Sequence, residues 1–309
     1  MSPPPSTELT GWNRWWQLKL RFGLAKLPFF PVRYRLRTPG LPDATFRWTR
    51  VIPFMHPVKG AFNFDLWGWD VRELRFLRRF LSPGMRFIDI GAHHGLYAVL
   101  ASHCVGNTGR VDAFEPAPEI HRRLRWHLRL NGARNARTHV RALGAERGRC
   151  EFFIPVGGID TISSLRRPTI GSGVVRRVEV EVLPLDEFVG ETQAPGGCFI
   201  KLDVEGGELA VLEGAQRFIR EQRPLWMFET IDVTAATWGK TARALVERFI
   251  AMDHQIFNFT QEGLLQPHVL KNVYPDPQDE SNCDLLAVPS EKTHLVRHLM
   301  ADTNTTHAT

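Results

Sequence analysis

This 309-residue chain lacks the sequence features of zinc-binding, disulfide-rich, membrane-spanning and secreted proteins. Its four cysteines lie far apart and include no Cys-x-x-Cys pair, so they favour ordinary reduced, mostly buried thiols over a zinc site or a disulfide framework. No apolar run approaches the ~18 residues of a membrane span, and the first residues, MSPPPSTE, lack the basic and apolar regions of a signal peptide. We therefore expect a cytoplasmic protein.

Signatures of nucleic-acid binding are also missing. The chain has no zinc-finger spacing, no RNP-like aromatic motif and no lysine-rich tail, so nucleic acid is not an expected partner. The formal charge of +6 and the pI near 9.4 come mostly from arginines spread along the chain. This charge permits anionic partners, such as phosphorylated donors or acidic sugars, without requiring them.

The N-terminal part differs in composition from the rest. Residues 1–10, like residues 301–309 at the other end, have the polar composition of disordered tails. Trp12, Trp15 and Trp16 are interleaved with basic residues, which suits packing against the main domain or a second subunit, with weak membrane contact as the alternative. The oligomeric state stays open.

Six prolines between residues 28 and 69 predict irregular structure and short strands. We therefore divide the chain into an accessory region at 1–69, a main domain at 70–290 and a C-terminal tail at 291–309.

From residue 70 onward the hydrophobic pattern alternates between strand and helix periods. Asp70 predicts a helix N-cap, and Glu73 completes a capping box before Leu74, Leu77 and Leu81. This alternation is typical of a doubly wound, Rossmann-like α/β sheet that is mostly parallel. Strands are expected at 86–90, 110–115, 137–142, 150–154, 177–183, 198–203, 225–229, 255–259 and 284–288, and helices at 95–104, 118–130, 207–221 and 240–252.

The most unusual segment is Phe-Ile-Lys-Leu-Asp-Val-Glu-Gly-Gly-Glu at 199–208. Alternation along the predicted strand places Lys201, Asp203 and Glu205 on one side, and Glu208 opens the next helix. Ligands of open α/β sheets bind beyond the carboxyl ends of the strands, where Asp203 and Glu205 are expected. The structural alternative is a Lys–Asp pair followed by acids that stabilise a helix start.

A glycine-containing turn follows the first predicted strand of the sheet. Asp89 lies in that strand, and Gly91-Ala92-His93-His94-Gly95 leads into a helix. Such glycines let the backbone approach a ligand, and the helix N-terminus supplies positive potential. The second strand ends at Glu115, about where a doubly wound fold presents an acid to a ribose diol. Glu115 could instead cap the helix that follows Pro116.

Two cofactor classes fit these features: dinucleotides and S-adenosylmethionine. The dinucleotide fingerprint Gly-x-Gly-x-x-Gly needs a middle glycine, and His93 occupies that place. S-adenosylmethionine has no pyrophosphate, so the wider Gly-x-x-x-Gly turn is sufficient, and Asp89 can receive its ammonium group directly or through water. The sequence therefore favours the methyl donor.

Seven short motifs occur in the order seen in FkbM-family S-adenosylmethionine-dependent methyltransferases, and the chain resembles this family over about residues 82–260. The motifs are Asp-Ile-Gly-Ala-x-x-Gly at 89–95, Ala-Phe-Glu-Pro at 113–116, Asn-Gly at 131–132, Ala-Leu-Gly at 142–144, Ser-Ser-Leu at 163–165, Leu-Asp-Glu-Phe at 185–188 and Ile-Lys-Leu-Asp-Val-Glu-Gly-Gly-Glu at 200–208.

The resemblance implies a class I methyltransferase fold with an antiparallel C-terminal strand, and O-methylation of a hydroxyl, often on a sugar or a polyketide-like product. The donor-binding residues expected on this basis are Asp89, Gly91, His93, Gly95, Glu115, Pro116 and Leu143. One departure is His93, where the family commonly has asparagine. A neutral imidazole can still hydrogen-bond the donor, whereas a protonated one would place a cation near the sulfonium and lower cofactor affinity at low pH.

Methyl transfer from a sulfonium is an in-line displacement that needs a positioned oxygen nucleophile and a proton acceptor. Asp203 is the first candidate for holding the acceptor hydroxyl or for general base, and Glu205 is the second. Lys201 either orients these carboxylates or forms a structural pair with Asp203. Glu208 and Glu229 could complete a carboxylate cluster.

A group of acids invites a divalent metal, but no ligand spacing requires one, so no metal is expected. His93 and His94 are adjacent and diverge too much for a metal pair. Ser163 and Ser164 lie in a long Gly/Ser-rich connection and could contact donor or acceptor as residues of a lid do. His121 and His127 are expected on a solvated, arginine-rich helix face.

Two rival functions stay open on the sequence: a nucleotide-dependent dehydrogenase, and a non-catalytic binding protein that keeps the donor fold as a scaffold. The missing middle glycine argues against the first, and the presence of Asp89, Glu115 and Asp203 argues against the second. The acceptor itself, whether sugar, lipid-linked glycan, polyketide or small metabolite, is not specified by the sequence.

Overall fold

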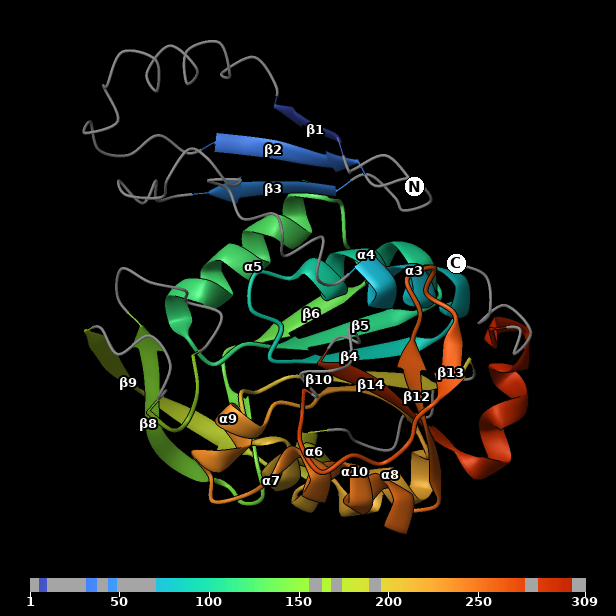
Figure 1. Cartoon of the computed structure of the whole chain (residues 1–309). Helices are drawn as coiled ribbons and strands as arrows, with labels where there is room; N and C mark the ends of the chain where they lie inside the picture. Colours follow the sequence, from blue (N-terminus) through green and yellow to red (C-terminus); the bar gives the residue numbers. More distant parts are fainter. Residues whose placement is uncertain are drawn as a thin grey trace.

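The structure is a computed structural model that describes residues 6–9, 32–37, 44–48, 71–155, 163–167, 174–188, 196–275 and 283–301. Its centre is an eight-stranded sheet with the order β13-β12-β14-β11-β10-β4-β5-β6 (Figure 1). The strands are β4 (Arg86–Ile90), β5 (Arg110–Phe114), β6 (Ala136–His139), β10 (Cys198–Leu202), β11 (Leu225–Glu229), β12 (His254–Phe259), β13 (Leu265–Pro267) and β14 (Asp284–Pro289).

Pairing within this sheet is mostly parallel. Strands β6, β5, β4, β10 and β11 pair in parallel, whereas β14 is antiparallel to β11 and β12, and β13 is antiparallel to β12. The expected Rossmann-like class I fold, with an antiparallel strand near the C-terminus, is therefore confirmed. Every residue of β4 and β10 is buried, as expected for parallel strands covered on both faces.

Helices cover both faces of the sheet (Figure 1). One face carries α3 (Val71–Phe80), α4 (Leu96–Val105) and α5 (Pro118–Leu130), and the other carries α6 (Leu185–Phe188), α7 (Glu208–Glu213), α8 (Gln216–Gln222), α9 (Asp232–Ala236) and α10 (Ala242–Ala251). Two large hydrophobic clusters fill the two spaces, with Phe87 and Phe199 in one and Trp226 and Phe249 in the other. The sheet is therefore held between two packed layers of helices, which fixes the ends of its strands.

Two expected elements are each divided in two. The strand expected at 137–142 is wrong: the chain bends after His139, and Ala142–Leu143 (β7) joins a separate sheet with the order β7-β9-β8. In that sheet β8 is Gly148–Pro155 and β9 is Val175–Leu183. The single helix expected at 207–221 is also wrong. It breaks at Gly214, where a Cβ would lie 2.0 Å from the carbonyl oxygen of Gly144, so close packing redirects the chain.

The two ends of the chain also differ from expectation. Residues 6–9, expected in a disordered tail, form β1 (Ser6–Leu9), which pairs with β2 (Val32–Arg37) and through it with β3 (Ala44–Trp48) beside α5 (Figure 1). At the other end, the chain continues to pack against the core beyond the domain boundary predicted at 290. Val296 and Leu299, within and beside the 3₁₀ helices Ser290–Leu295 and Arg297–Leu299, are buried in the core.

Asp70 and the tryptophans at 12, 15 and 16 lie outside the described residues.

The four cysteines are all free thiols, but only Cys198 is buried, and Cys150 is exposed. The expectation of mostly buried thiols is therefore wrong. Among the described helices, none has the length and apolar character needed to cross a lipid bilayer.

A buried charge pair joins the first two strands of the sheet. Asp112 in β5 is fully buried and accepts hydrogen bonds from Arg86 Nε at 3.0 Å and Nη2 at 2.7 Å, and from Arg110 Nη2 at 2.7 Å. Burial alone would raise the pKa of Asp112, but hydrogen bonds from His139, Arg110 and Arg86 outweigh it and lower the pKa to about 2. Arg86 thus has its counter-ion inside the sheet.

We expect Asp112→Asn to lower the free energy of unfolding by about 3 kcal/mol, because the charge of Arg86 would be left buried without a counter-ion. Urea denaturation measures this loss. Glu179→Gln is the matched control, since it breaks an exposed pair with Arg149 whose loss should cost less than ~1 kcal/mol. Equal losses in the two variants would contradict the structural role of Asp112.

Candidate active site

The turn after β4 packs directly against the end of β10. Gly91 has φ +82°, and a Cβ there would lie 1.7 Å from the carbonyl oxygen of Asp203. Gly95 has φ +86°, and its Cβ would lie 2.5 Å from Leu124 Cδ1 in α5. Gly91 is thus required by packing against the main chain of Asp203, whereas at Gly95 the positive φ is the stronger reason for glycine. This packing brings the expected donor turn against the expected catalytic acid.

Glu115 fastens that turn to the start of α5. Its Oε2 accepts a hydrogen bond from the backbone N–H of His93 at 3.0 Å, and its Oε1 accepts one from the N–H of Ala117 at 2.8 Å. The helix-capping alternative therefore applies to Glu115, and its contact with a ribose stays a prediction. His93 itself adopts φ +46°, a conformation uncommon for residues other than glycine.

Two histidines of α5 that we expected on a solvated helix face are instead buried. His121 and His127 are both buried on α5, and His127 Nδ1 lies 2.7 Å from the carbonyl oxygen of His94. The error arose because the arginines around them on the helix suggested a uniformly polar face. The structure instead turns these two rings toward the sheet and the turn after β4.

Asp89 is a completely buried carboxylate that lacks a hydrogen-bonded partner. Its exposed fraction is 0%, and no donor in the described part of the chain has hydrogen-bonding geometry to either oxygen. Burial raises the pKa of Asp89 to about 6, although Lys201 and the backbone of Ala98 lower it and Asp203 raises it. A buried carboxylate with so little hydrogen bonding is costly to ionise, so this position fits a cationic group such as an ammonium.

Lys201 brings a buried positive charge to the site. It is paired in register with Asp89 across β4 and β10, and its Nζ donates to Asp203 Oδ2 at 2.7 Å. Its Nζ also lies 4.8 Å from the ring centroid of Tyr97. Burial would lower the pKa of Lys201, but Asp203 and Asp89 outweigh it and raise the pKa. The expected Lys–Asp pair is present at the end of β10, and the β4–β10 register places Asp89 opposite Lys201 on the adjacent strand.

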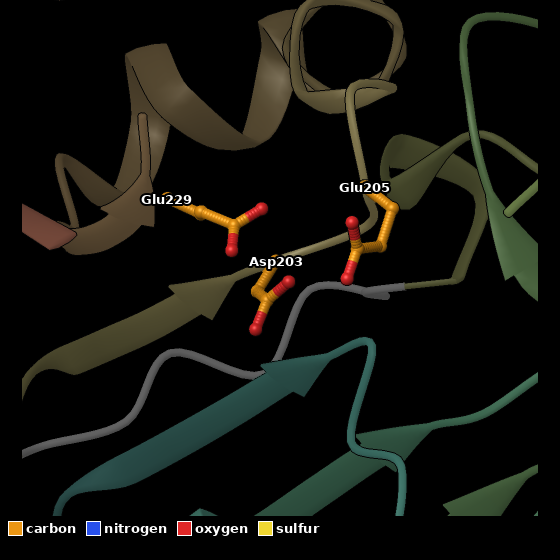
Figure 2. A group of neighbouring side chains, drawn as sticks. All are labelled: Asp203, Glu205 and Glu229. Atoms are coloured by element: carbon orange, nitrogen blue, oxygen red, sulfur yellow. The ribbon is translucent and has the colours of Figure 1, made fainter. Parts of the chain in front are cut away.

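Three carboxyl groups converge beyond the ends of β10 and β11. Asp203 follows β10, Glu205 lies two residues further along, and Glu229 ends β11. One oxygen from each lies within 4.8 Å of the others, and Figure 2 shows the three groups turned toward one another. Oxygen ligands at this spacing could hold a divalent cation.

Protonation is another way to neutralise the negative charge of these carboxylates. Burial, followed by the charges of Asp203 and Glu208, raises the pKa of Glu205 to about 9, against the opposing effect of Lys201. Burial and the neighbouring acids also raise the pKa of Glu229 well above its usual value. Glu205 therefore holds a proton at neutral pH in the absence of a cation. The expectation that no metal is needed stays a prediction.

Two further acids, Glu208 and Asp284, lie near the cluster. Glu208 Oε1 accepts hydrogen bonds from the N–H groups of Val204 at 3.0 Å and Gly206 at 3.2 Å, which shapes the turn between β10 and α7. Asp284 lies opposite Glu229 in the β11–β14 register. The sequence analysis missed Asp284 because an antiparallel strand arriving from a distant segment carries no local signal beyond an acid at its start.

The remaining two candidates lie in the core beside β5. Pro116 is buried, and Leu143 in β7 is buried in the same cluster as Phe114 and Leu183. Their expected contact with a donor stays a prediction. The structure therefore brings together the turn after β4, Glu115 and the acids of β10, and places Leu143 in the core cluster that also contains Phe114 of β5.

The raised carboxyl pKa values make stability depend on pH. A glutamate in the unfolded chain loses its proton near its ordinary pKa of 4.5, whereas Glu205 in the folded protein keeps its proton to about pH 9. The folded state therefore binds more protons in this window, and stability falls as pH rises through it. We expect the free energy of unfolding, measured with urea, to fall by at least ~1 kcal/mol from pH 7 to pH 9.

The variant Glu205→Gln should show a shallower decline over the same range, because its side chain cannot titrate. Glu247→Gln is the control, since Glu247 is a half-exposed partner of Arg243 far from the cluster in the sequence. A profile that is flat in the native protein, or identical in Glu205→Gln, would contradict the burial of this carboxyl group.

Comparison with known proteins gives one family match. The model of the family described as Methyltransferase FkbM domain matches residues 89–255, which include the turn after β4, Glu115 and the acids of β10 and β11. No curated protein matches the chain.

Solved structures with similar folds include methyltransferases of several kinds. A precorrin-6y C5,15-methyltransferase from Geobacter metallireducens is 14% identical, with a TM-score of 0.40 over 72% of this chain and 88% of that one. An rRNA methylase from Streptococcus thermophilus is 13% identical, with a TM-score of 0.38 over 70% and 92% of the two chains. Fibrillarin from Aeropyrum pernix, with natively bound S-adenosyl-L-methionine, is 16% identical, with a TM-score of 0.35 over 83% and 94%.

These TM-scores are too low for the likenesses to bear on the function of this chain. The family match carries the assignment, because it spans more than half of the sequence and contains the residues of the site. The chain belongs to the FkbM family of S-adenosylmethionine-dependent methyltransferases.

Proposed function

We propose that this protein is an O-methyltransferase that moves a methyl group from S-adenosylmethionine to a hydroxyl of a sugar, glycan or natural-product acceptor. The observation that carries the proposal is the position of Asp203. Its carbonyl oxygen abuts the turn after β4, and its carboxylate is paired with Lys201 and lies beside Glu205 and Glu229. An acceptor hydroxyl held there would be next to the expected donor turn.

The residues around the turn after β4 fit the donor. Asp89 would receive the ammonium group, since it is a buried carboxylate without a hydrogen-bonded partner in the described ranges. Glu115 would bind the ribose hydroxyls with the carboxylate that also holds the His93 backbone. Gly91, Gly95 and His93 form the turn itself, and Pro116 and Leu143 would contact the donor beside β5.

The bound donor supplies an electrophilic methyl group on a sulfonium. Asp203 would hold the acceptor hydroxyl and accept its proton, because its carboxylate projects from the end of a central strand. Lys201 would keep that carboxylate oriented through its 2.7 Å hydrogen bond. Glu205 suits a different task. Because its pKa is about 9, it carries a proton at neutral pH and can donate a hydrogen bond to an acceptor oxygen.

A hydroxyl acceptor suits this arrangement because a hydroxyl needs both a hydrogen-bond donor and a proton acceptor. Asp203 and Glu205 offer these two functions within one cluster. Nucleic acid is not proposed as the acceptor, because strongly anionic phosphates would meet a site rich in carboxylates. The dehydrogenase alternative is disfavoured by family membership and by His93 at the place of the middle glycine.

Donor binding can be tested without knowledge of the acceptor. We expect S-adenosylhomocysteine to raise the melting temperature and NAD to leave it unchanged, because a ligand that binds the folded state stabilises it by mass action. Glu115→Ala should weaken S-adenosylhomocysteine binding by about tenfold, as expected for the loss of a charge-assisted hydrogen bond. A shift with NAD alone would reverse the assignment of the cofactor, and unchanged affinity of Glu115→Ala would remove its ribose role.

Turnover can be tested by a screen of hydroxylated acceptors with labelled donor. For Asp203→Asn we expect a loss of at least ~100-fold in kcat, with S-adenosylhomocysteine affinity within about twofold of the native protein. Glu213→Gln, on the exposed side of α7, is the matched control and should keep full activity. An active Asp203→Asn variant would exclude Asp203 as the general base. Retained donor binding without transfer to any acceptor would favour a non-catalytic binding protein.

A further inference from the structure

The turn that carries Glu205 has an unusual backbone. Glu205 adopts φ +59°, in the left-handed region that residues other than glycine seldom occupy. Gly206 follows with φ +98°. Such a conformation persists only where surrounding contacts fix it. The contacts made by residues 203–207 therefore show what keeps the Glu205 carboxyl group in the cluster.

One of these contacts comes from a distant segment. Ser164 lies in the described stretch 163–167 of the β8–β9 connection, and its hydroxyl donates to the carbonyl oxygen of Glu205 at 3.0 Å. Ser164 is itself fixed on β8, because Phe153 N–H donates to its carbonyl at 2.8 Å and its own N–H donates to Phe153 at 3.2 Å. It is 3% exposed. The Glu205 backbone is thus bonded to a residue anchored on a second sheet.

The other side of the same turn is also in close contact. A Cβ on Gly206 would lie 2.3 Å from the carbonyl oxygen of Thr234 in α9, and one on Gly207 would lie 3.1 Å from the Trp238 ring. The guanidinium of Arg166 stacks 5.0 Å from the centre of that ring. Residues 203–207 therefore lie between the described stretch 163–167 and the segment around α9.

Each contact acts on a different part of the turn. Glu208 holds the N–H groups of Val204 and Gly206, whereas Ser164 holds the carbonyl group of Glu205. The carbonyl orientation sets ψ of Glu205, and together with φ this determines where its side chain points. Without the Ser164 bond, the Glu205 peptide could rotate out of the left-handed region, and the carboxyl group would turn away from Asp203 and Glu229.

We infer that Ser164 is a positioning residue for methyl transfer, and that its hydroxyl fixes the Glu205 backbone so that the Glu205 carboxyl group faces Asp203 and Glu229. The inference rests on the proposed function, since the carboxyl group matters only if an acceptor is bound there. Ser164 is not proposed to touch the reacting atoms. Its whole effect is exerted through Glu205.

A double-mutant cycle tests this dependence. We expect Ser164→Ala to lower kcat about tenfold while S-adenosylhomocysteine affinity stays within about twofold, and Ser164→Thr, which keeps a hydroxyl, to stay within about threefold of native kcat. In the Glu205→Gln background, Ser164→Ala should cause less than about a twofold further loss. An equal loss in both backgrounds, or no loss in either, would overturn the inference.

A second measurement needs no acceptor. Hydrogen exchange followed by mass spectrometry should show faster exchange in peptides covering 203–207 in Ser164→Ala than in the native protein. Ser102→Ala is the matched control, since Ser102 is a similarly buried serine whose hydroxyl donates to Asn135 away from the site. Unchanged exchange at 203–207, or equal changes in both variants, would overturn the inference.

The two proposals fail in different ways. If the native protein binds no S-adenosylhomocysteine, the proposed function fails while the exchange result still decides whether Ser164 fixes the turn. If donor binding and transfer are normal but Ser164→Ala has native kcat and exchange, only the inference fails. Ser164→Cys, which keeps the shape of the side chain but replaces the hydroxyl with a weaker hydrogen-bond donor, takes the place of Ser164→Ala if that variant does not fold.

Discussion

The site depends on one buried cation shared between two strands. Lys201 lies inside the sheet, paired by hydrogen bond to Asp203 and by register to Asp89. Glu205, Glu229 and Asp284 lie close to the same point, so negative groups outnumber the cation. Because burial penalises uncompensated charge, this excess must be neutralised by protons or by a ligand. The chemistry of the site follows from how that neutralisation is divided among the acids.

The acids divide into groups that suit different tasks. Asp203 has Lys201 as its direct partner, whereas Glu205 and Glu229 are driven toward the protonated form by burial and by the charges of neighbouring acids. Asp89 differs from both groups. It lies on the adjacent strand β4 and has no hydrogen-bonded partner in the described residues. One edge of the sheet thus presents Asp203 as a proton acceptor, Glu205 as a protonated hydrogen-bond donor and Asp89 as a carboxylate that can bind a cation. A hydroxyl acceptor beside a sulfonium donor needs this combination.

Contacts from distant parts of the chain hold these groups in place. Glu115 connects the turn after β4 to α5, Gly91 lets that turn meet the Asp203 carbonyl, and Ser164 reaches the Glu205 backbone from the second sheet. Each contact acts on the main chain of a turn rather than on a reacting side chain. Main-chain positions change little when side chains rotate, so the carboxyl groups remain preorganised for an acceptor.

The sequence by itself determined the alternation of strands and helices, the turn after β4, and the acids at the ends of β5 and β10, because these signals are local and periodic. It also identified Glu205, Glu208 and Glu229 as members of one cluster, since parallel strands end at the same edge. Only the tertiary structure decided that the 137–142 strand divides between two sheets, that Asp284 faces Glu229, and that Gly91 is required by packing against Asp203. These features depend on contacts between segments far apart in the chain, and no local pattern of residues encodes such contacts.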